Sequence, residues 1–416
     1  MTHATASARR TDVRPRPWLG RAVRGLVGTA LLLHGALHLL GAASGLLGQR
    51  VESLHRVSGP AVGALWLVAG ALVMAAAVGL LAGRRRWWTV GAAALLVSPV
   101  AVLTDWSEAS FGTAANLLLL LAVAHGWAAE GPRSRRERFR RAAASALAGP
   151  PAAAGGDRRP GPGVHPGVVV TEHDLAALPP ALATYLRRSG AVGQPHVRAV
   201  RAQLTGRIRG GPTHPWMPFT VEQVDTVGAS MQRHFRMDAV MRGLPVDVLH
   251  TFADGHAAME VALCSVLPLV NRHGPDLDRA ETVTLFNDLC VLAPAALLDV
   301  PVVWRQRDPH RVSGVFTHGS HTVQADLLFD ADGDLVDFVS DDRLEANPDG
   351  TFVPRGWSTP LRAHRDFGGR RLPATGEAWW HTADPDGSFC YIELTVRTLV
   401  TLGAGETAHV LVGTGE

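Results

Sequence analysis

The first third of the chain consists of long apolar stretches separated by short basic segments. Four windows without Asp, Glu, Lys or Arg cover residues 25–48, 57–83, 87–104 and 109–129. A helix rises 1.5 Å per residue, so each window spans a bilayer core of about 30 Å or nearly does. The pattern predicts four transmembrane helices. A cleaved signal peptide is not expected, because the first window is long and no clear small-residue cleavage site precedes a soluble segment.

After residue 170 the pattern changes to short runs in which apolar and polar side chains alternate, as in half-buried strands. Residues 231–240 show this clearly, with apolar side chains at 235, 237 and 239. Further strands are predicted over residues 196–209, 219–226, 245–252, 257–263, 302–307, 311–317, 322–329, 335–340, 377–381 and 389–402. Two helices are predicted over residues 175–188 and 278–298. Short connections between strands favour antiparallel pairing.

The predicted fold class is therefore an α-helical four-pass membrane domain followed by an α+β soluble domain. We expect the soluble domain to be a large curved antiparallel sheet, or an open β-barrel, with two packed helices. The expected organisation is a basic cytoplasmic tail (1–24), four transmembrane helices (25–130), an Arg-rich juxtamembrane segment with a Pro/Gly/Ala linker (131–170) and the soluble β-rich domain (171–416). We expect the Arg-rich segment to be either a helix along the membrane surface or only the basic segment that follows the fourth transmembrane helix.

Charge separates the two halves of the chain. Residues 1–160 hold 19 Arg and 7 acidic residues, or +12, whereas residues 161–416 hold 21 Arg and 30 acidic residues, or −9, which sums to the net charge of +3. Basic loops remain in the cytoplasm, and the Arg-rich segments flank alternate helices, so both termini and the soluble domain are predicted to be cytoplasmic. The acidic soluble domain argues against nucleic acid as a partner.

Composition excludes several kinds of chemistry. The chain has no Lys, which removes Walker A phosphate loops and pyridoxal Schiff bases. It also lacks the GxSxG, HExxH, GxGxxG and CxxC patterns, so hydrolase, zinc-protease and dinucleotide functions lack their usual motifs. The three cysteines cannot pair completely, which favours reduced thiols in the cytoplasm. We expect no cofactor and no metal.

Three histidines lie within the predicted membrane helices. His34 and His38 are four residues apart on one helix face, and His125 lies in the fourth window at a depth comparable to that of His34, so these last two could meet at one level. They could form a haem or metal ligand pair, a proton relay, or hydrogen bonds to Ser, Thr or backbone between helices. In the same first helix, Gly41 and Gly45 have the spacing that permits close helix contact, within one chain or in a homo-oligomer.

The soluble half offers a second candidate site. Asn287 and Asp288 interrupt an otherwise apolar helix and would need partners if buried, and Arg343 is one candidate. These residues could form a structural network, orient a ligand or supply a catalytic acid or base. Trp357 could line an apolar ligand cavity or belong to the core. The acidic run 330–334 departs from the EF-hand spacing and predicts a hairpin turn.

Several strings resemble one known family. They are His34-Gly35 with His38-Leu39-Leu40-Gly41 and segments 63–67 and 111–117 in the membrane half, and segments 287–290, 293–295, 338–343 and 357–360 in the soluble half. The chain resembles an uncharacterised bacterial family of unknown function that couples a four-helix membrane segment to this soluble domain. The resemblance covers nearly the whole chain apart from both ends and the linker. It implies this architecture and no particular chemistry.

The functional expectation is a membrane protein without enzymatic activity. Its partners would be the lipid bilayer and a lipophilic or small-molecule ligand, bound in the curved sheet, or it would sense the state of the membrane. One alternative is a membrane-tethered enzyme that acts on a small or lipid substrate through Asp288 and Arg343. Another is a redox or proton module built on the intramembrane histidines.

Overall fold

The computed structural model describes residues 17–47, 59–148, 169–228, 231–347, 350–382 and 387–403. Most of the predicted basic tail and nearly all of the predicted linker lie outside these residues. The chain forms two compact units, which are described separately. The helical unit consists of residues 16–138 with 262–267, and the β unit contains residues 139–261 and 268–416.

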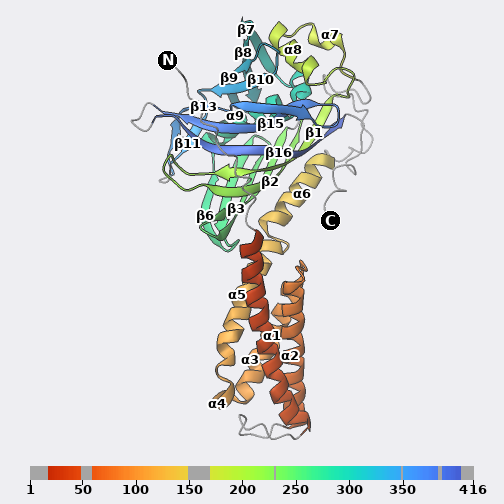
Figure 1. Ribbon diagram of the computed structural model, residues 1–416, viewed down its shortest axis with the longest axis vertical. Coiled ribbons are helices and arrows are strands. Elements are labelled where there is room, and N and C mark those ends of the chain that lie inside the picture. The colour runs from red at the N-terminus through yellow and green to blue at the C-terminus, as the bar shows by residue number, and fades with distance from the viewer. Residues whose placement is uncertain are drawn as a thin grey trace, which may run out of the picture. The chain divides into compact units, whose positions relative to one another are not determined.

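Four helices of the helical unit are long and apolar enough to cross a membrane. These helices are α1 (Pro17–Leu47), α2 (Pro60–Leu81), α3 (Trp87–Thr104) and α5 (Gly112–Glu130). The one-turn helix α4 (Trp106–Ala109) connects α3 to α5 (Figure 1). Three of the predicted windows match α2, α3 and α5 to within three residues, and α1 begins eight residues before the first window. Leu31, Val73, Ala94 and Leu119, one from each helix, meet in a buried apolar cluster.

Glycines bring α1 and α2 into close contact. A Cβ atom added to Gly45 would lie 2.5 Å from the Cα atom of Gly63, and one added to Gly41 would lie 2.3 Å from the indole ring of Trp66. Only glycine leaves room for such contacts. The glycine spacing of the first helix therefore serves packing between two helices of one chain.

The β unit is built on an antiparallel sheet of fourteen strands (Figure 1). The first half of the sheet comprises β1 (Val197–Ile208), β2 (Met217–Thr226), β3 (Gln232–Met241), β4 (Leu244–Ala253), β5 (His256–Leu263) and β6 (Leu267–His273). The second half comprises β7 (Val302–Asp308), β8 (Arg311–His318), β9 (His321–Phe329), β10 (Leu335–Ser340), β13 (Gly356–Ser358), β14 (Leu361–Asp366), β15 (Arg371–His381) and β16 (Phe389–Gly403). A separate short pair joins β11 (Leu344–Ala346) to β12 (Phe352–Pro354).

The order of the strands explains how the sheet is organised. It runs β6-β5-β4-β3-β2-β1-β16-β15-β13-β10-β9-β8-β7, with β14 beside β15. The first and last strands of the chain therefore pair at the centre, and the consecutive strands β6 and β7 occupy opposite edges. These edges are not paired with each other in the described residues, so the sheet is not a closed barrel. The predicted fold class is confirmed in its four long apolar helices and its large open antiparallel sheet with packed helices.

One helix connects the two edges of the sheet. Helix α9 (Pro275–Leu292) follows β6, and the 3₁₀ helix η1 (Pro294–Leu298) leads into β7. Fourteen of the 18 residues of α9 are buried. It contacts β9 and β10 in the second half of the sheet, and it forms ion pairs with Arg233 of β3 in the first half. The sheet therefore curves around α9, which occupies the concave face predicted to hold a ligand.

Prolines change the bounds of both helices predicted in the β unit. The helix predicted over 278–298 ends at Leu292, because Pro294 has no N–H to continue the α-helical hydrogen bonds. The helix predicted over 175–188 is two helices, α7 (Glu172–Leu175) and α8 (Pro180–Arg188), because Pro180 starts a new helix at its first position.

The Arg-rich segment forms α6 (Arg135–Ala148). A helix that lies on a membrane surface exposes its apolar face to lipid, whereas the apolar face of α6 is buried. Phe139, Ala143 and Leu147 pack in one buried cluster with four residues of the sheet, Ala199, Val224, Leu249 and Leu402. This part of α6 therefore belongs to the core of the β unit.

Candidate functional site

The two histidines of α1 are held by a polar cluster in the middle of the helical unit. His38 Nε2 lies 2.8 Å from Ser98 Oγ on α3, and Ser98 Oγ donates a 2.7 Å hydrogen bond to Asn116 Oδ1 on α5. His34 Nε2 lies 3.3 Å from both of these oxygens. All four side chains are buried. The cluster thus joins three of the four long helices.

The hydrogen bonds determine the tautomer of both imidazoles. The hydroxyl hydrogen of Ser98 is used by Asn116, so Ser98 Oγ must accept from His38 Nε2–H. His34 Nε2 also faces two acceptors and therefore carries its own hydrogen. The Nδ1 atom of each neutral ring is then an acceptor. The buried Nδ1 of His38 has no hydrogen-bond partner among the described residues.

A cavity of about 170 Å³ lies beside this cluster. His34 and His38 form part of its wall, together with Trp66, whose ring centroid is 5.1 Å from that of His38. The remaining lining residues are Leu37, Leu40, Gly41, Val102, Glu108, Ala109, Phe111 and Gly112. The wall is therefore mainly apolar with a few polar groups, which is typical of small-molecule sites.

His125 does not join the other two histidines. It lies nine residues after Asn116 on α5, about 13.5 Å further along the helix axis. Its Nδ1 atom is 2.8 Å from the carbonyl oxygen of Cys264. The expected meeting of His34 with His125 is wrong, because His34 lies beside Asn116, about two and a half helical turns from His125 along α5. Among the described residues no group of three or more His, Cys, Asp or Glu side chains is placed to hold a metal ion.

In the β unit, Asp288 is part of a buried ion cluster. Its Oδ2 atom accepts 2.7 Å hydrogen bonds from Arg233 Nε on β3 and from Gln223 Nε2 on β2. Arg233 also reaches Glu281 on α9, with 3.2 Å between Nη1 and Oε2. The neighbouring Asn287 accepts a 2.7 Å hydrogen bond from Thr359 Oγ1. Both polar residues of the apolar helix therefore have partners.

Arg343 lies on another side of the same cluster. Its Nη1 atom is 3.5 Å from Glu281 Oε1, and its guanidinium lies 5.4 Å from the ring centroid of Trp357. Trp357 is 4 % exposed and donates a 3.0 Å hydrogen bond to Tyr391 Oη. No ion pair joins Arg343 to Asp288 in the described part of the chain. Instead of the predicted pair of Asp288 with Arg343, Asp288 pairs with Arg233, and Arg343 pairs with Glu281.

Burial and charge set the protonation states of this cluster. Burial raises the pKa of Asp225 well above its usual value, and the neighbouring Asp288 charge adds to the effect. Burial lowers the pKa of His250 to about 4. Burial alone would raise the pKa of Glu281, but His250 and the two arginines outweigh it and lower that pKa. The carboxyl groups of Asp288 and Glu281 thus face the guanidiniums of Arg233 and Arg343, as in a structural ion cluster.

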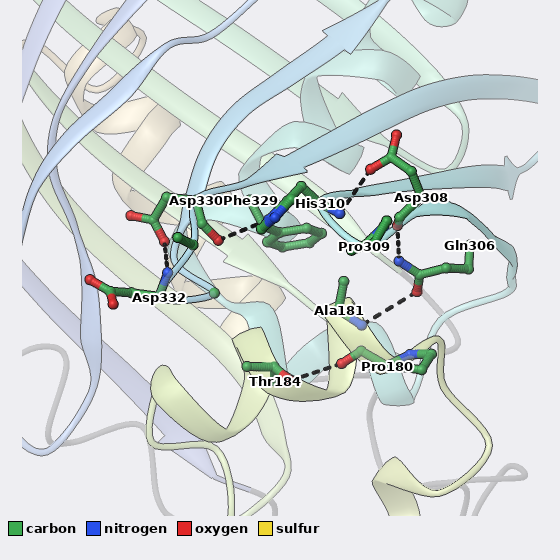
Figure 2. Close-up of a pocket in the computed structure, with 12 residues that line it drawn as sticks. Pro180, Ala181, Thr184, Gln306, Asp308, Pro309, His310, Phe329, Asp330 and Asp332 are labelled. Carbon is green, nitrogen blue, oxygen red and sulfur yellow. Dashed lines mark hydrogen bonds between the residues drawn. The ribbon is translucent and has the colours of Figure 1, made fainter.

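A larger cleft of about 570 Å³ lies at the surface of the β unit (Figure 2). It is formed by the start of α8, the β7–β8 turn and the β9–β10 turn. Its polar groups serve these turns: Asp308 Oδ1 accepts from the His310 backbone N–H, and Asp330 Oδ1 accepts from those of Asp332 and Asp334. The acidic run 330–334 is thus the hairpin turn that its spacing predicts.

The family model for the Family of unknown function (DUF6544) matches residues 168–394, more than half of the chain. The chain belongs to this family. The resemblance found in the sequence is confirmed for the β unit, which contains all but six of the matched residues. No curated protein matches the chain.

Solved structures give distant similarities to this DUF6544 member. A domain described as an outer membrane lipoprotein-sorting protein from Vibrio parahaemolyticus is 8 % identical, with 49 % of this chain and 85 % of that chain covered and a TM-score of 0.29. A DUF1329 family protein from Desulfovibrio piger is 10 % identical, with 56 % and 97 % covered and a TM-score of 0.31. A β-barrel-like DUF1849 protein from Brucella abortus is 10 % identical, with 50 % and 99 % covered and a TM-score of 0.20.

Sequence reasoning missed several residues of both sites. Ser98 is an ordinary serine in an apolar window, and Arg233 is one polar position of an alternating strand. Glu281 lies within the predicted second helix. Its position seven residues before Asp288, two helical turns away, was the available signal that both acids share one face.

Proposed function

We propose that this DUF6544 member is a multi-pass membrane protein whose helical unit binds a small molecule beside His34 and His38. The observation that carries the proposal is the cavity lined by these two imidazoles. Ionisable side chains in the middle of apolar helices are costly and usually mark a functional site. A purely structural pair would need only its hydrogen bonds, whereas here a cavity lies beside them.

The position of the pair supports an intramembrane site. His34 lies 12 residues after Ala22 and 13 before Leu47, the ends of the apolar part of α1. At 1.5 Å per residue this places it about 18 and 20 Å from those ends. A ligand bound there would lie within the hydrocarbon region. The haem, metal and proton-relay alternatives use the same two histidines and stay predictions.

We also propose that both ends of the helical unit's sequence face the cytoplasm, because Arg84, Arg85 and Arg86 follow α2 and further arginines follow α5. Site-directed labelling with a membrane-impermeant maleimide on intact cells tests this orientation. In a Cys264→Ala background, Ser107→Cys should be labelled from outside and Arg85→Cys only after permeabilisation. The reverse pattern would contradict the orientation.

Native mass spectrometry of the purified full chain tests the binding function. Ala109 lines the cavity, whereas Ala114 on α5 is exposed. The wild type and the Ala114→Phe control should retain a bound small molecule, and Ala109→Phe, which fills the cavity, should lose it. Equal retention by all three proteins, or retention by none of them from native membranes, would refute the proposed site.

A further inference from the structure

We infer that the turn between β5 and β6 and the start of β6 insert into the surface of the bilayer, where Val266, Leu267 and Leu269 contact lipid. This inference goes beyond the proposed binding site and rests only on the membrane position of the helical unit, which the proposed function includes. It is carried by the exposure of these side chains, by the contacts of the turn with α5 and α6, and by a second turn of the same character.

Residues 266–269, with the sequence Val-Leu-Pro-Leu, are four consecutive exposed apolar residues at the start of an edge strand. Leu267 is 56 % exposed, Val266 55 % and Leu269 44 %. Exposed apolar edges promote aggregation, so a large one that is kept marks a surface that a protein or a membrane covers. Pro268 has no N–H, and prolines within sheets lie where this group would point to the open edge. A strand of a second copy would therefore pair poorly here.

The turn before this run belongs to the helical unit. The carbonyl oxygen of Cys264 lies 2.8 Å from His125 Nδ1 on α5, and that of Ser265 accepts a 3.4 Å hydrogen bond from Arg135 Nη1 on α6. His125 is five residues before Glu130, the last residue of α5, and so lies about 7.5 Å from the end of that helix. Segments at a membrane surface bury their apolar side chains about 5–10 Å into the boundary of head groups and acyl chains. The turn therefore lies at the depth of this boundary.

Other side chains at this end of α5 mark the same level. Trp127, two residues after His125, is 48 % exposed. Arg133, Arg135 and Arg136 follow the helix. Tryptophan is enriched where a membrane meets water, and arginines are enriched on its cytoplasmic side. The contact with His125 thus places the β5–β6 turn between the apolar span and the basic segment.

The β3–β4 turn repeats the character of the β5–β6 turn. Strands β3 to β6 are consecutive neighbours in the sheet, so these two turns lie at the same end of their strands. Leu244 is 48 % exposed, and an exposed proline follows it, as one follows Leu267. Segments 239–246 and 261–270 contain no acidic residue, and the exposed Arg242 adds a cation. Apolar side chains beside a cation fit a bilayer with anionic head groups.

Quenching of a fluorescent label by nitroxide-bearing lipid tests this insertion in the full chain. Leu267→Cys and Leu244→Cys, each in the Cys264→Ala background, carry the dye NBD, because the other two cysteines are buried. Each labelled chain is reconstituted singly into nanodiscs of phosphatidylcholine and phosphatidylglycerol, with or without a nitroxide-labelled phosphatidylcholine. Two controls are labelled in the same way.

The first control is Val303→Cys, since Val303 is an apolar residue that is 74 % exposed on β7, at the opposite edge of the sheet. The second is Leu121→Cys, since Leu121 is 61 % exposed on α5 and reports whether the helical unit is in the bilayer. The labels at 267 and 244 should lose emission when the nitroxide lipid is present, as the label at 121 does. The label at 303 should keep its emission.

Emission at 267 or 244 that stays as high as at 303, while the label at 121 is quenched, would overturn this inference alone. An unquenched label at 121 would show that the helical unit is not in the bilayer, and the proposed function would fail with the inference. Protection of the label at 267 from aqueous iodide without quenching by the nitroxide lipid would assign this surface to a protein partner, which also overturns insertion.

Discussion

His38 and Ser98 lie 60 residues apart in the sequence, and a 2.8 Å hydrogen bond joins their side chains between α1 and α3. Ser98 is 0 % exposed, and its hydroxyl also donates to Asn116 on α5. One small side chain therefore connects two other helices and fixes the tautomer of the imidazole beside the cavity. Its removal affects both the stability of the helical unit and the geometry of the proposed site.

Ser98→Ala should destabilise the helical unit by about 1–2 kcal/mol, the value of hydrogen bonds between membrane helices in model peptides. The variant leaves His38 Nε2–H without its acceptor, so retention of the bound molecule should also fall. Thermal unfolding in detergent and native mass spectrometry measure the two effects. The exposed Ser107→Ala is the matched control, and a Ser98→Ala protein that behaves like it would show that the cluster has no energetic role.

Gly45→Leu should prevent α1 and α2 from packing, since even a Cβ atom at this position would lie 2.5 Å from the backbone of Gly63. We expect loss of the monodisperse species in size-exclusion chromatography of the detergent-solubilised chain. Gly25→Leu, on the same helix with nothing within 4 Å of the added Cβ, should be tolerated. Identical elution profiles for the two variants would contradict the described contact.

Arg233→Met should destabilise the β unit by about 3–5 kcal/mol, because it leaves Asp288 and Glu281 buried without their shared cation. For a unit of this size the loss corresponds to a decrease in Tm of about 10 °C. Arg311→Met provides the control, since Arg311 is half exposed and pairs with Asp326 at the surface. That pair should contribute at most about 1 kcal/mol. The expectation fails if the two variants melt at the same temperature.

The β unit should lose stability through His250 as the pH falls from about 6.5 to 4. Burial keeps this imidazole neutral by lowering its pKa to about 4, so across this range the unfolded chain takes up a proton that the folded chain does not. The contribution is up to about 3 kcal/mol. His250→Gln should flatten the pH dependence of the free energy of unfolding, measured by denaturant titration at several pH values. An unchanged slope would show that His250 titrates normally when folded.

The sequence predicted the elements of this fold better than their contacts. Hydropathy alone located the four long helices, and alternation located most strands, because both signals are local. The edge strand β6 was missed, since Leu267, Leu269 and neighbouring residues are mainly exposed and show no clean alternation. The prolines at 180 and 294 were visible in the sequence, and they mark the helix boundaries that the prediction placed wrongly.

The candidate site was predictable only in part, for the same reason. The spacing of His34 and His38 identifies a polar face of α1, but their partners come from α3 and α5, whose rotation about their axes the sequence does not specify. Likewise Asp288 was expected to need a cation, and two arginines lie in its neighbourhood. Which arginine contacts it depends on how the sheet curves around α9, a property of the complete strand order.

A cryo-electron microscopy map of the full chain in lipid nanodiscs tests the central claim most directly. We predict non-protein density in the cavity lined by His34, His38 and Trp66. The Ala109→Phe protein should lack this density. A well-resolved wild-type map in which side chains close the cavity, or in which it is empty, would contradict the account.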